Sequence, residues 1–334
     1  MHRVDLEGKK ILFFAPAFFG YEKHIEKRLT ERGADVDYFN ERFSDKTLFK
    51  IIMRLNKHLL SACINRYYKR IYKTIKGNHY DIFLVINIET MPVWFVKKIT
   101  TLQSCPVKIL YIWDSMAWKH NLQIYFNHFD RVYSFDRKDV LKYKDKILLR
   151  PLFYLPQYAD IKPQQKYDYD LCFIGSAHTD RYKIACALKQ IARQNNFTTF
   201  IYLYLQKPYV YYLSKLTNRN FAHSRKSDFA YTPLTERQIT DIMQKSRIIV
   251  DTQGPNQSGL TMRTIETLAA RRKMITTNDD IVNYDFYCPD NICVCDFYKT
   301  FPSKAFLDSP FAENRSEQYY YKYSLDGFLD DILS

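Results

Sequence analysis

Short apolar runs alternate with amphipathic stretches along the whole chain. Runs of four to eight apolar residues are typical of buried strands, and apolar positions three and four residues apart predict helices. In the first half we expect strands at 9–14, 34–39, 80–87, 108–113 and 131–135, and helices at 21–32, within 46–76, from Pro92 and at 137–143.

The same alternation restarts at Tyr169. Residues 150–169 interrupt it with Pro151, Pro156 and Pro163, which mark a linker. Beyond it we expect strands at 169–175, 198–205, 247–251 and 273–277, and helices at 179–193, 206–217, 235–245, 260–271 and 319–333.

Two local signals support these boundaries. Gly33 follows the first helix, where a glycine enters the left-handed C-terminal turn without steric cost. Asp136 precedes the helix at 137, where its side chain can accept from a free backbone N–H.

Strands that alternate with helices predict parallel, doubly wound sheets. We therefore expect an α/β protein of two Rossmann-like domains that face a cleft. The expected organisation is a first Rossmann-like domain at 1–150, a linker at 151–168, a second Rossmann-like domain at 169–315 and a closing helix at 316–334. Ligands of such sheets bind outside the carboxyl ends of the strands.

Positive charge is concentrated in one stretch of the first domain. The 334 residues hold 50 Lys and Arg against 36 Asp and Glu, a formal net charge of +14. No acid lies between Lys46 and Tyr80, and nine of the cations fall at 46–76, opposite a helical apolar stripe. A solvated helix face and a surface for an anionic partner both explain this stretch. Anionic lipid headgroups attract such segments.

Other compositional features narrow the class of protein. No apolar run approaches the ~20 residues that span a bilayer, and the first residues do not resemble a secretory signal. The seven cysteines form no CxxC pair and are expected to be reduced thiols. No Cys/His cluster has zinc spacing, so no metal site is expected. These features predict a cytoplasmic protein, with the basic stretch at the inner face of the cell membrane.

Gly175 and Gly259, two of the eight glycines in the chain, lie in strand-to-helix loops of the second half. Gly175 ends the first strand there, and His178 and Arg181 follow it. A flexible turn and a helix N-terminus present backbone N–H groups to an anion, and a guanidinium adds a planar donor fork. The pattern indicates a phosphate site, although a tight turn also explains the glycine.

The second loop runs from Asp251 into a helix. Gly259 allows close approach of a ligand to the backbone. Arg263 and Glu266 share a helix face. A cation in the first turn opposes the helix dipole unless it meets an anion, and a carboxylate one turn later can bind a ribose diol. A surface Arg–Glu pair is the alternative.

These segments resemble a known family. Residues 257–270, with 273–278 and 283–287, are similar to the donor-binding half of GT-B-fold glycosyltransferases. More narrowly, they resemble the bacterial lipopolysaccharide and capsule-cluster branch related to spore-maturation-type glycosyltransferases. Asp170–Gly175 and Arg181 match the start of that half. The resemblance spans about 168–296 and is only topological over 1–150.

The resemblance implies a metal-independent transferase that takes a nucleotide-sugar donor, with UDP, GDP, dTDP and CMP all open. By position, Glu266 would hold the ribose and Arg263 and Arg181 the diphosphate. The loop at 231–234 would hold the base. The implied donor site comprises Gly175, His178, Arg181, Tyr231, Leu234, Gln257, Ser258, Gly259, Leu260, Thr261, Arg263 and Glu266. Ser258 stands where retaining members carry a Glu, which leaves the stereochemical outcome open.

Glycosyl transfer also needs a base for the acceptor hydroxyl. Loops of the first domain offer His24, Glu89 and Asp114. Asp114 is preferred because its strand end faces the predicted cleft, although helix capping also explains it.

The leading hypothesis is transfer of a sugar to a lipid-linked or cell-surface glycan. A GT-B-like nucleotide-sugar epimerase or hydrolase is the enzymatic alternative. A nucleic-acid-binding protein that uses the Tyr-rich basic stretch is the non-enzymatic one. No nucleic-acid-binding motif is present, so nucleic acid is not expected as a partner.

Overall fold

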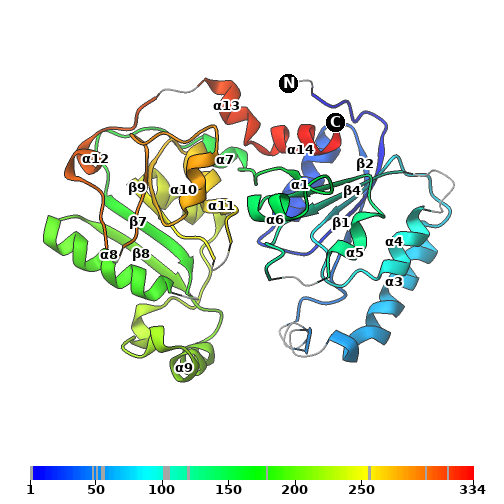
Figure 1. Ribbon diagram of the computed structural model, residues 1–334, viewed down its shortest axis with the longest axis horizontal. Helices are drawn as coiled ribbons and strands as arrows, with labels where there is room; N and C mark the ends of the chain where they lie inside the picture. Colours follow the sequence, from blue (N-terminus) through cyan, green and yellow to red (C-terminus); the bar gives the residue numbers. More distant parts are fainter. Residues whose placement is uncertain are drawn as a thin grey trace. The chain divides into compact units, whose positions relative to one another are not determined.

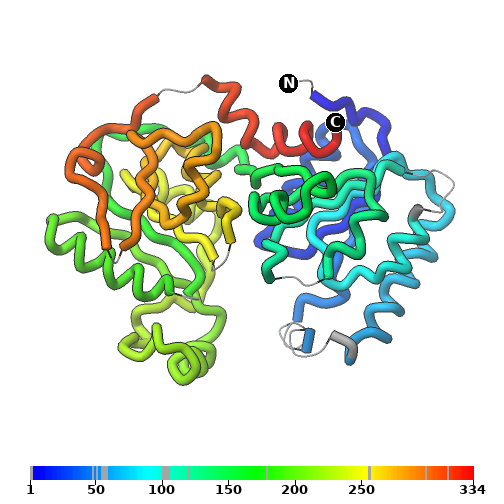
Figure 2. The backbone as a smooth tube through the Cα atoms, in the orientation of Figure 1, coloured from blue at the N-terminus to red at the C-terminus, as the bar shows by residue number. Residues whose placement is uncertain are grey.

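The computed structural model describes residues 3–46, 49, 52–53, 57–100, 106–118, 121–177, 180–254, 257–297, 299–313 and 316–334. The chain divides into two compact units (Figures 1 and 2). Unit 1 comprises Met1–Pro151 and Asp326–Ser334, and unit 2 comprises Leu152–Leu325.

Unit 1 is built on a parallel sheet in the order β2-β1-β3-β4-β5-β6. Its strands are β1 (Lys10–Ala15), β2 (Asp35–Asn40), β3 (Ile82–Ile86), β4 (Val107–Ile112), β5 (Arg131–Ser134) and β6 (Leu148–Leu149). Its helices are α1 (Tyr21–Glu31), the 3₁₀ turn η1 (Lys57–Leu60), α3 (Ser61–Ile75), α4 (Val93–Thr100), α5 (Gln123–Phe126), α6 (Arg137–Lys142) and α14 (Leu325–Leu333).

Helices cover both faces of this sheet, so β3 is wholly buried and β4 is buried from Ile109 to Ile112. The rings of Phe14 and Tyr68 lie 5.5 and 4.9 Å from that of Phe95, which joins β1, α3 and α4 in one core. Phe328 of α14 packs edge-on against Tyr111 of β4 at 4.8 Å. The C-terminal helix therefore belongs to the core of unit 1.

Unit 2 is built on a second parallel sheet, in the order β11-β10-β9-β7-β8. Its strands are β7 (Tyr169–Ser176), β8 (Thr199–Tyr204), β9 (Ser246–Asp251), β10 (Lys273–Thr276) and β11 (Ile292–Val294). Its helices are α7 (Pro156–Ala159), α8 (Arg181–Asn195), α9 (Pro208–Thr217), α10 (Glu236–Gln244), α11 (Met262–Ala269), α12 (Lys304–Asp308) and α13 (Glu317–Lys322), with 3₁₀ turns η2 (Arg219–Phe221), η3 (Lys226–Asp228) and η4 (Asp279–Asn283).

The expected capping residues act as predicted. Gly33 has a φ of 92°, in the left-handed region that glycine favours. The Asp136 side chain accepts from the backbone N–H of Lys138 and caps α6. Local chemistry thus sets these boundaries.

Two segments differ from the expectation. The closing segment at 316–334 forms two helices, α13 and α14, which are separated at Tyr323 and Ser324. The expected linker at 151–168 contains α7, and Leu152, Phe153 and Leu155 within it are buried. The segment is packed into the fold because these apolar residues lie between its prolines.

The basic stretch predicted at 46–76 is described only in part. Residues 47, 48, 50, 51 and 54–56 lie outside the described residues. Over α3 the predicted amphipathic pattern is confirmed, because Ile64, Tyr68, Ile71 and Ile75 are buried while Arg66, Lys69, Arg70 and Lys73 are exposed.

Candidate functional site

Arg181 lies across two strand ends of unit 2. It begins α8, just beyond β7, and its guanidinium donates to the Thr252 hydroxyl at 3.0 Å, the Thr252 carbonyl at 2.9 Å and the Ser176 carbonyl at 3.3 Å. A Cβ atom on Gly175 would lie 3.2 Å from Nη1 of Arg181. Glycine at 175 therefore allows this placement. His178, the remaining residue predicted for this loop, lies outside the described residues.

The charge of Arg181 is costly where it lies. Burial lowers the pKa of its guanidinium, and the nearby cation of Arg263 acts in the same direction. The carboxylates of Asp251 and Asp180 oppose this shift but do not reverse it. An anion bound beside this guanidinium would also favour its charged form.

Asp251 organises the start of the next helix, α11. Both of its carboxylate oxygens accept from the Thr261 hydroxyl at 2.9 Å, and one accepts from the Thr264 hydroxyl at 2.5 Å. Thr261 also caps α11 by accepting from the Thr264 backbone N–H at 3.2 Å. The predicted site residue Thr261 therefore has a structural role, which places the first turn of α11 beside the end of β9.

Side chains hold the glycine loop before α11. The Gln257 amide donates to the Gly259 carbonyl at 2.9 Å, and the Asn278 amide donates to the Ser258 carbonyl at 3.0 Å. Ser258 and Leu260 are buried. The loop is thereby tied to the segment that follows β10, so three strand ends contribute to one region of unit 2.

Glu266 and Arg263 form an ion pair inside the protein. Nη1 of Arg263 lies 2.8 Å from Oε2 of Glu266, whose side chain is only 3% exposed. Burial raises the pKa of the Tyr158 phenol on α7, and the nearby charge of Glu266 acts in the same direction. The pair is therefore enclosed rather than on the surface. Tyr158 was not predicted as a site residue because it lies in the expected linker at 151–168.

The loop predicted for base binding follows η3. The Tyr231 hydroxyl donates to the Lys226 carbonyl at 3.1 Å, and Ala230 bridges to Tyr204 at the end of β8. Tyr231 and Leu234 are partly buried. The loop therefore lies at the carboxyl end of β8, the same edge of the sheet that carries the loops after β7 and β9.

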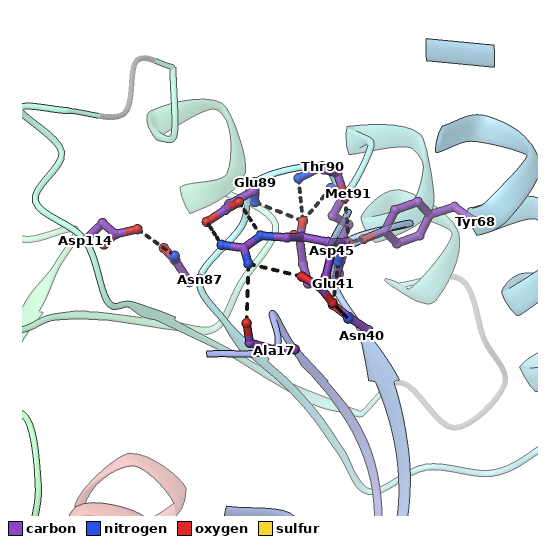
Figure 3. A network of polar contacts seen from close by, with 11 residues as sticks. Ala17, Asn40, Glu41, Asp45, Tyr68, Asn87, Glu89, Thr90, Met91 and Asp114 are labelled. Carbon is purple, nitrogen blue, oxygen red and sulfur yellow. Dashed lines mark hydrogen bonds and ion pairs between the residues drawn. The ribbon is translucent and has the colours of Figure 1, made fainter. Parts of the chain in front are cut away.

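In unit 1, a buried carboxylate joins the ends of β2 and β3 (Figure 3). Oε1 of Glu41 accepts from the backbone N–H groups of Glu89, Thr90 and Met91 at 2.9, 2.6 and 2.7 Å. The Glu41 carbonyl accepts from the Tyr68 hydroxyl at 2.6 Å. Burial raises the pKa of Glu41 to about 7, with a contribution from the charge of Glu89. Glu41 thus fixes the loop after β3.

The candidate base Glu89 forms an ion pair in this loop. Its two carboxylate oxygens accept from Nε and Nη2 of Arg42 at 2.6 and 2.7 Å. Arg42 also donates to the Ala17 carbonyl at 3.4 Å, so the pair joins the loops after β1, β2 and β3. This bidentate pair engages both carboxylate oxygens of Glu89.

Asp114 follows β4 in a separate part of the network (Figure 3). Its Oδ2 accepts from the Asn87 amide at 2.8 Å, and Asn87 has a left-handed backbone with φ 61°. Asp139 holds the loop beyond Asp114 by accepting from the Met116 N–H at 2.9 Å. Burial raises the pKa of Asp139 to about 6. His24, the third candidate base, is partly buried in the first turn of α1.

Three residues of this region were not predicted as site residues from the sequence: Glu41, Asn87 and Asp139. Glu41 and Asn87 directly follow the strands β2 and β3, and Asp139 lies in the first turn after the N-cap Asp136. These positions are the sequence signal from which they could have been predicted. Their partners, however, lie in other loops.

Two further findings concern metals and membranes. Among the described residues, no group of three or more His, Cys, Asp and Glu could hold a metal ion. No helix within the described part of the chain is long and apolar enough to cross a membrane.

Solved structures with a similar fold are known, but no sequence comparison finds a match. No family model and no curated protein matches the chain. An α-glucosyltransferase in complex with UDP and a 13-mer DNA shares 12% identity, with a TM-score of 0.58 over 97% of this chain and 94% of that one. The E. coli trehalose-6-phosphate synthase bound with UDP-2-fluoro glucose shares 10% identity, with a TM-score of 0.58 over 98% and 91%. The catalytic domain of Arabidopsis thaliana starch synthase IV, bound to ADP and acarbose, shares 7% identity, with a TM-score of 0.50 over 98% and 95%.

Together with the two parallel-sheet α/β units, these likenesses show a GT-B architecture. The predicted fold class is therefore confirmed.

Proposed function

We propose that the protein is a glycosyltransferase that moves a sugar from a nucleotide donor to a glycan acceptor. The observation that carries this proposal is the partly buried Arg181, held by Thr252 and Ser176 at the carboxyl ends of β9 and β7. A nucleotide diphosphate is the anion that would offset its charge. The fold supports the proposal, because similar structures contain UDP, UDP-2-fluoro glucose or ADP.

The proposed donor site uses the edge of unit 2. Arg181, Arg263 and the loop at Gly259 would bind the diphosphate, Glu266 the ribose and the loop at Tyr231–Leu234 the base. Glu266 is held by its ion pair with Arg263, which orients its carboxylate before a diol arrives. The leaving nucleoside diphosphate would be stabilised by positive charge that is already in place.

The proposed reaction exchanges one C–O bond for another. The acceptor hydroxyl oxygen bonds to the anomeric carbon, the bond from that carbon to the diphosphate oxygen breaks, and the acceptor proton passes to a base. Among the three candidate bases, Asp114 is our choice, because Glu89 is held by Arg42 in a bidentate pair. Asn87 would orient the Asp114 carboxylate.

The acceptor is proposed to be a lipid-linked or cell-surface glycan such as lipopolysaccharide or capsule. The basis is the exposed cationic face of α3, where Arg66, Lys69, Arg70, Lys73 and Lys76 have no ion pair among the described residues. An anionic membrane would attract this face. We propose a cytoplasmic enzyme that meets the inner leaflet through α3.

Nucleotide binding to variants of unit 2 tests the donor site. Isothermal titration with UDP, GDP, ADP, dTDP and CMP should identify one preferred nucleotide. Arg181→Ala should weaken its binding about 10- to 100-fold, because a charge-assisted hydrogen bond contributes about 1.5–3 kcal/mol. Arg237→Ala is the matched control, since Arg237 on α10 is 92% exposed.

Three outcomes would contradict the proposal. The first is the absence of binding by any of the five nucleotides. The second is equal binding by Arg181→Ala and Arg237→Ala. The third is complete turnover of the donor sugar without an acceptor, which would favour the epimerase or hydrolase.

A further inference from the structure

Helix α9 of unit 2 exposes an apolar face. Tyr209, Tyr212, Leu213 and Leu216 are 59, 56, 59 and 86% exposed. Their spacing of three and four residues places them along one side of the helix. The opposite side carries the buried Tyr211, whose hydroxyl donates to the Ser224 carbonyl at 2.9 Å. The side of α9 that carries Tyr211 therefore packs against the rest of unit 2, and the opposite side exposes the leucines to solvent.

An apolar face of this kind needs an explanation. Single exposed leucines are common, but a row of four large side chains on one helix marks an interaction surface. Burying such a row would remove apolar area from water at no cost to the fold, because the buried side of α9 keeps its own contacts.

Charge around α9 indicates the chemistry of the partner. No Asp or Glu occurs between Arg181 and Ser227. Lys207 precedes α9, and Arg219, Arg225 and Lys226 follow it, all exposed. These four cations form no ion pair among the described residues. The partner must therefore combine negative charge with an apolar interior.

We infer that α9 is an interfacial helix that inserts its Tyr/Leu face into an anionic lipid bilayer. Leucines would enter the acyl region, and tyrosines would lie at the headgroup boundary with their hydroxyls in water. The flanking cations would meet lipid phosphates. A second copy of the chain would bring like charges together, and nucleic acid would leave the leucines without an apolar partner.

The position of α9 links this surface to the donor edge of unit 2. It follows β8, which runs parallel to β7 and β9, so it begins at the same sheet edge as the loops of Arg181 and Asp251 (Figure 1). An interfacial α9 would bring that edge of unit 2 close to the bilayer. The inference stands on exposure and charge, and it does not depend on glycosyl transfer.

Vesicle binding by matched variants tests the inference. The full-length protein is titrated with vesicles of phosphatidylcholine plus phosphatidylglycerol, and with phosphatidylcholine alone. The double variant Leu213→Ser, Leu216→Ser should bind the anionic vesicles at least about tenfold more weakly, because two leucines no longer enter the bilayer. The control is Leu141→Ser, Leu148→Ser, which removes two leucines that are 59 and 55% exposed in unit 1. It should bind like the unaltered chain.

A local reporter separates α9 from every other basic surface. In Tyr212→Trp, fluorescence should be quenched by lipids with brominated acyl chains more strongly than in Leu148→Trp. Equal quenching, or equal vesicle affinity of the two double variants, would overturn the inference. So would self-association or RNA binding that Leu213→Ser, Leu216→Ser abolishes without an effect on vesicle binding.

Discussion

At the scale of single residues, Glu41 couples the fold of unit 1 to pH. Its carboxylate is fully buried, and its Oε2 has no hydrogen-bond partner among the residues that the structure describes. Burial and the nearby charge of Glu89 raise its pKa from 4.5 to about 7. The protonated form is therefore favoured by folding, and the stability that it contributes is complete below pH 4.5 and lost as the pH rises through 7.

We therefore predict a pH-dependent effect of Glu41→Gln, whose amide stays neutral and still offers an oxygen to the three N–H groups. Relative to this variant, the unaltered protein should lose about 3 kcal/mol of unfolding free energy between pH 4.5 and 7.5. Urea denaturation at several pH values measures the difference. Asp139, which also titrates, is present in both proteins and cancels. A difference that does not vary with pH would contradict the prediction.

At the scale of elements, α3 shows how one helix serves two purposes. Its inner side packs Tyr68 against Phe95 in the core, and Tyr68 holds the Glu41 carbonyl. Its outer side carries the exposed cations Arg66, Lys69, Arg70 and Lys73. Packing of the inner side offsets the conformational entropy lost when the helix forms. The outer side can therefore carry several like charges without unfolding the helix.

We predict that the outer side of α3 contributes to membrane affinity through charge. Lys69→Gln, Lys73→Gln should weaken binding to anionic vesicles about tenfold or more, at about 1 kcal/mol per lysine near the surface. The loss should shrink as salt is added. Lys183→Gln, Lys189→Gln on α8 is the matched control, because both lysines are exposed on a helix of unit 2. If the two pairs weaken binding equally, net charge rather than the α3 surface is responsible.

At the scale of the whole molecule, the proposed reaction divides its work between the units. The residues proposed to bind the nucleotide belong to unit 2, and the proposed base Asp114 belongs to unit 1. The chain returns to unit 1 through α14, where Asp330 lies 2.5 Å from Arg32 and both side chains are buried. Each buried charge needs the other, so removal of either would be costly.

This division predicts that binding and chemistry can be separated. Asp114→Asn should lower kcat of glycosyl transfer by about 10²- to 10⁴-fold, the usual contribution of a general base, and leave the Kd for nucleotide unchanged. Steady-state transfer assays and nucleotide titration measure the two quantities. Asp130→Asn changes a carboxylate that lies before β5 in the same sheet and should leave both unaltered. A normal kcat in Asp114→Asn would exclude Asp114 as the base.

Much of this protein follows from short-range patterns. Buried strands alternate with amphipathic helices, and Gly33 and Asp136 mark boundaries through contacts with residues close in sequence. Such features depend on propensity and periodicity, which act within a few residues. The α/β class and the loops that carry Gly175 and Asp251 were therefore predictable.

Only the tertiary structure decided which side chains meet. Glu41 contacts a loop 48 to 50 residues away, and the charge of Glu266 helps to raise the pKa of Tyr158 on another helix. The apolar outer face of α9 has the same periodicity as a buried one, and its exposure becomes visible only when the other side of the helix is seen to pack. Burial and long-range hydrogen bonds depend on the whole fold. The sequence by itself therefore determined the elements and their order, while the structure decided the partners and the surfaces.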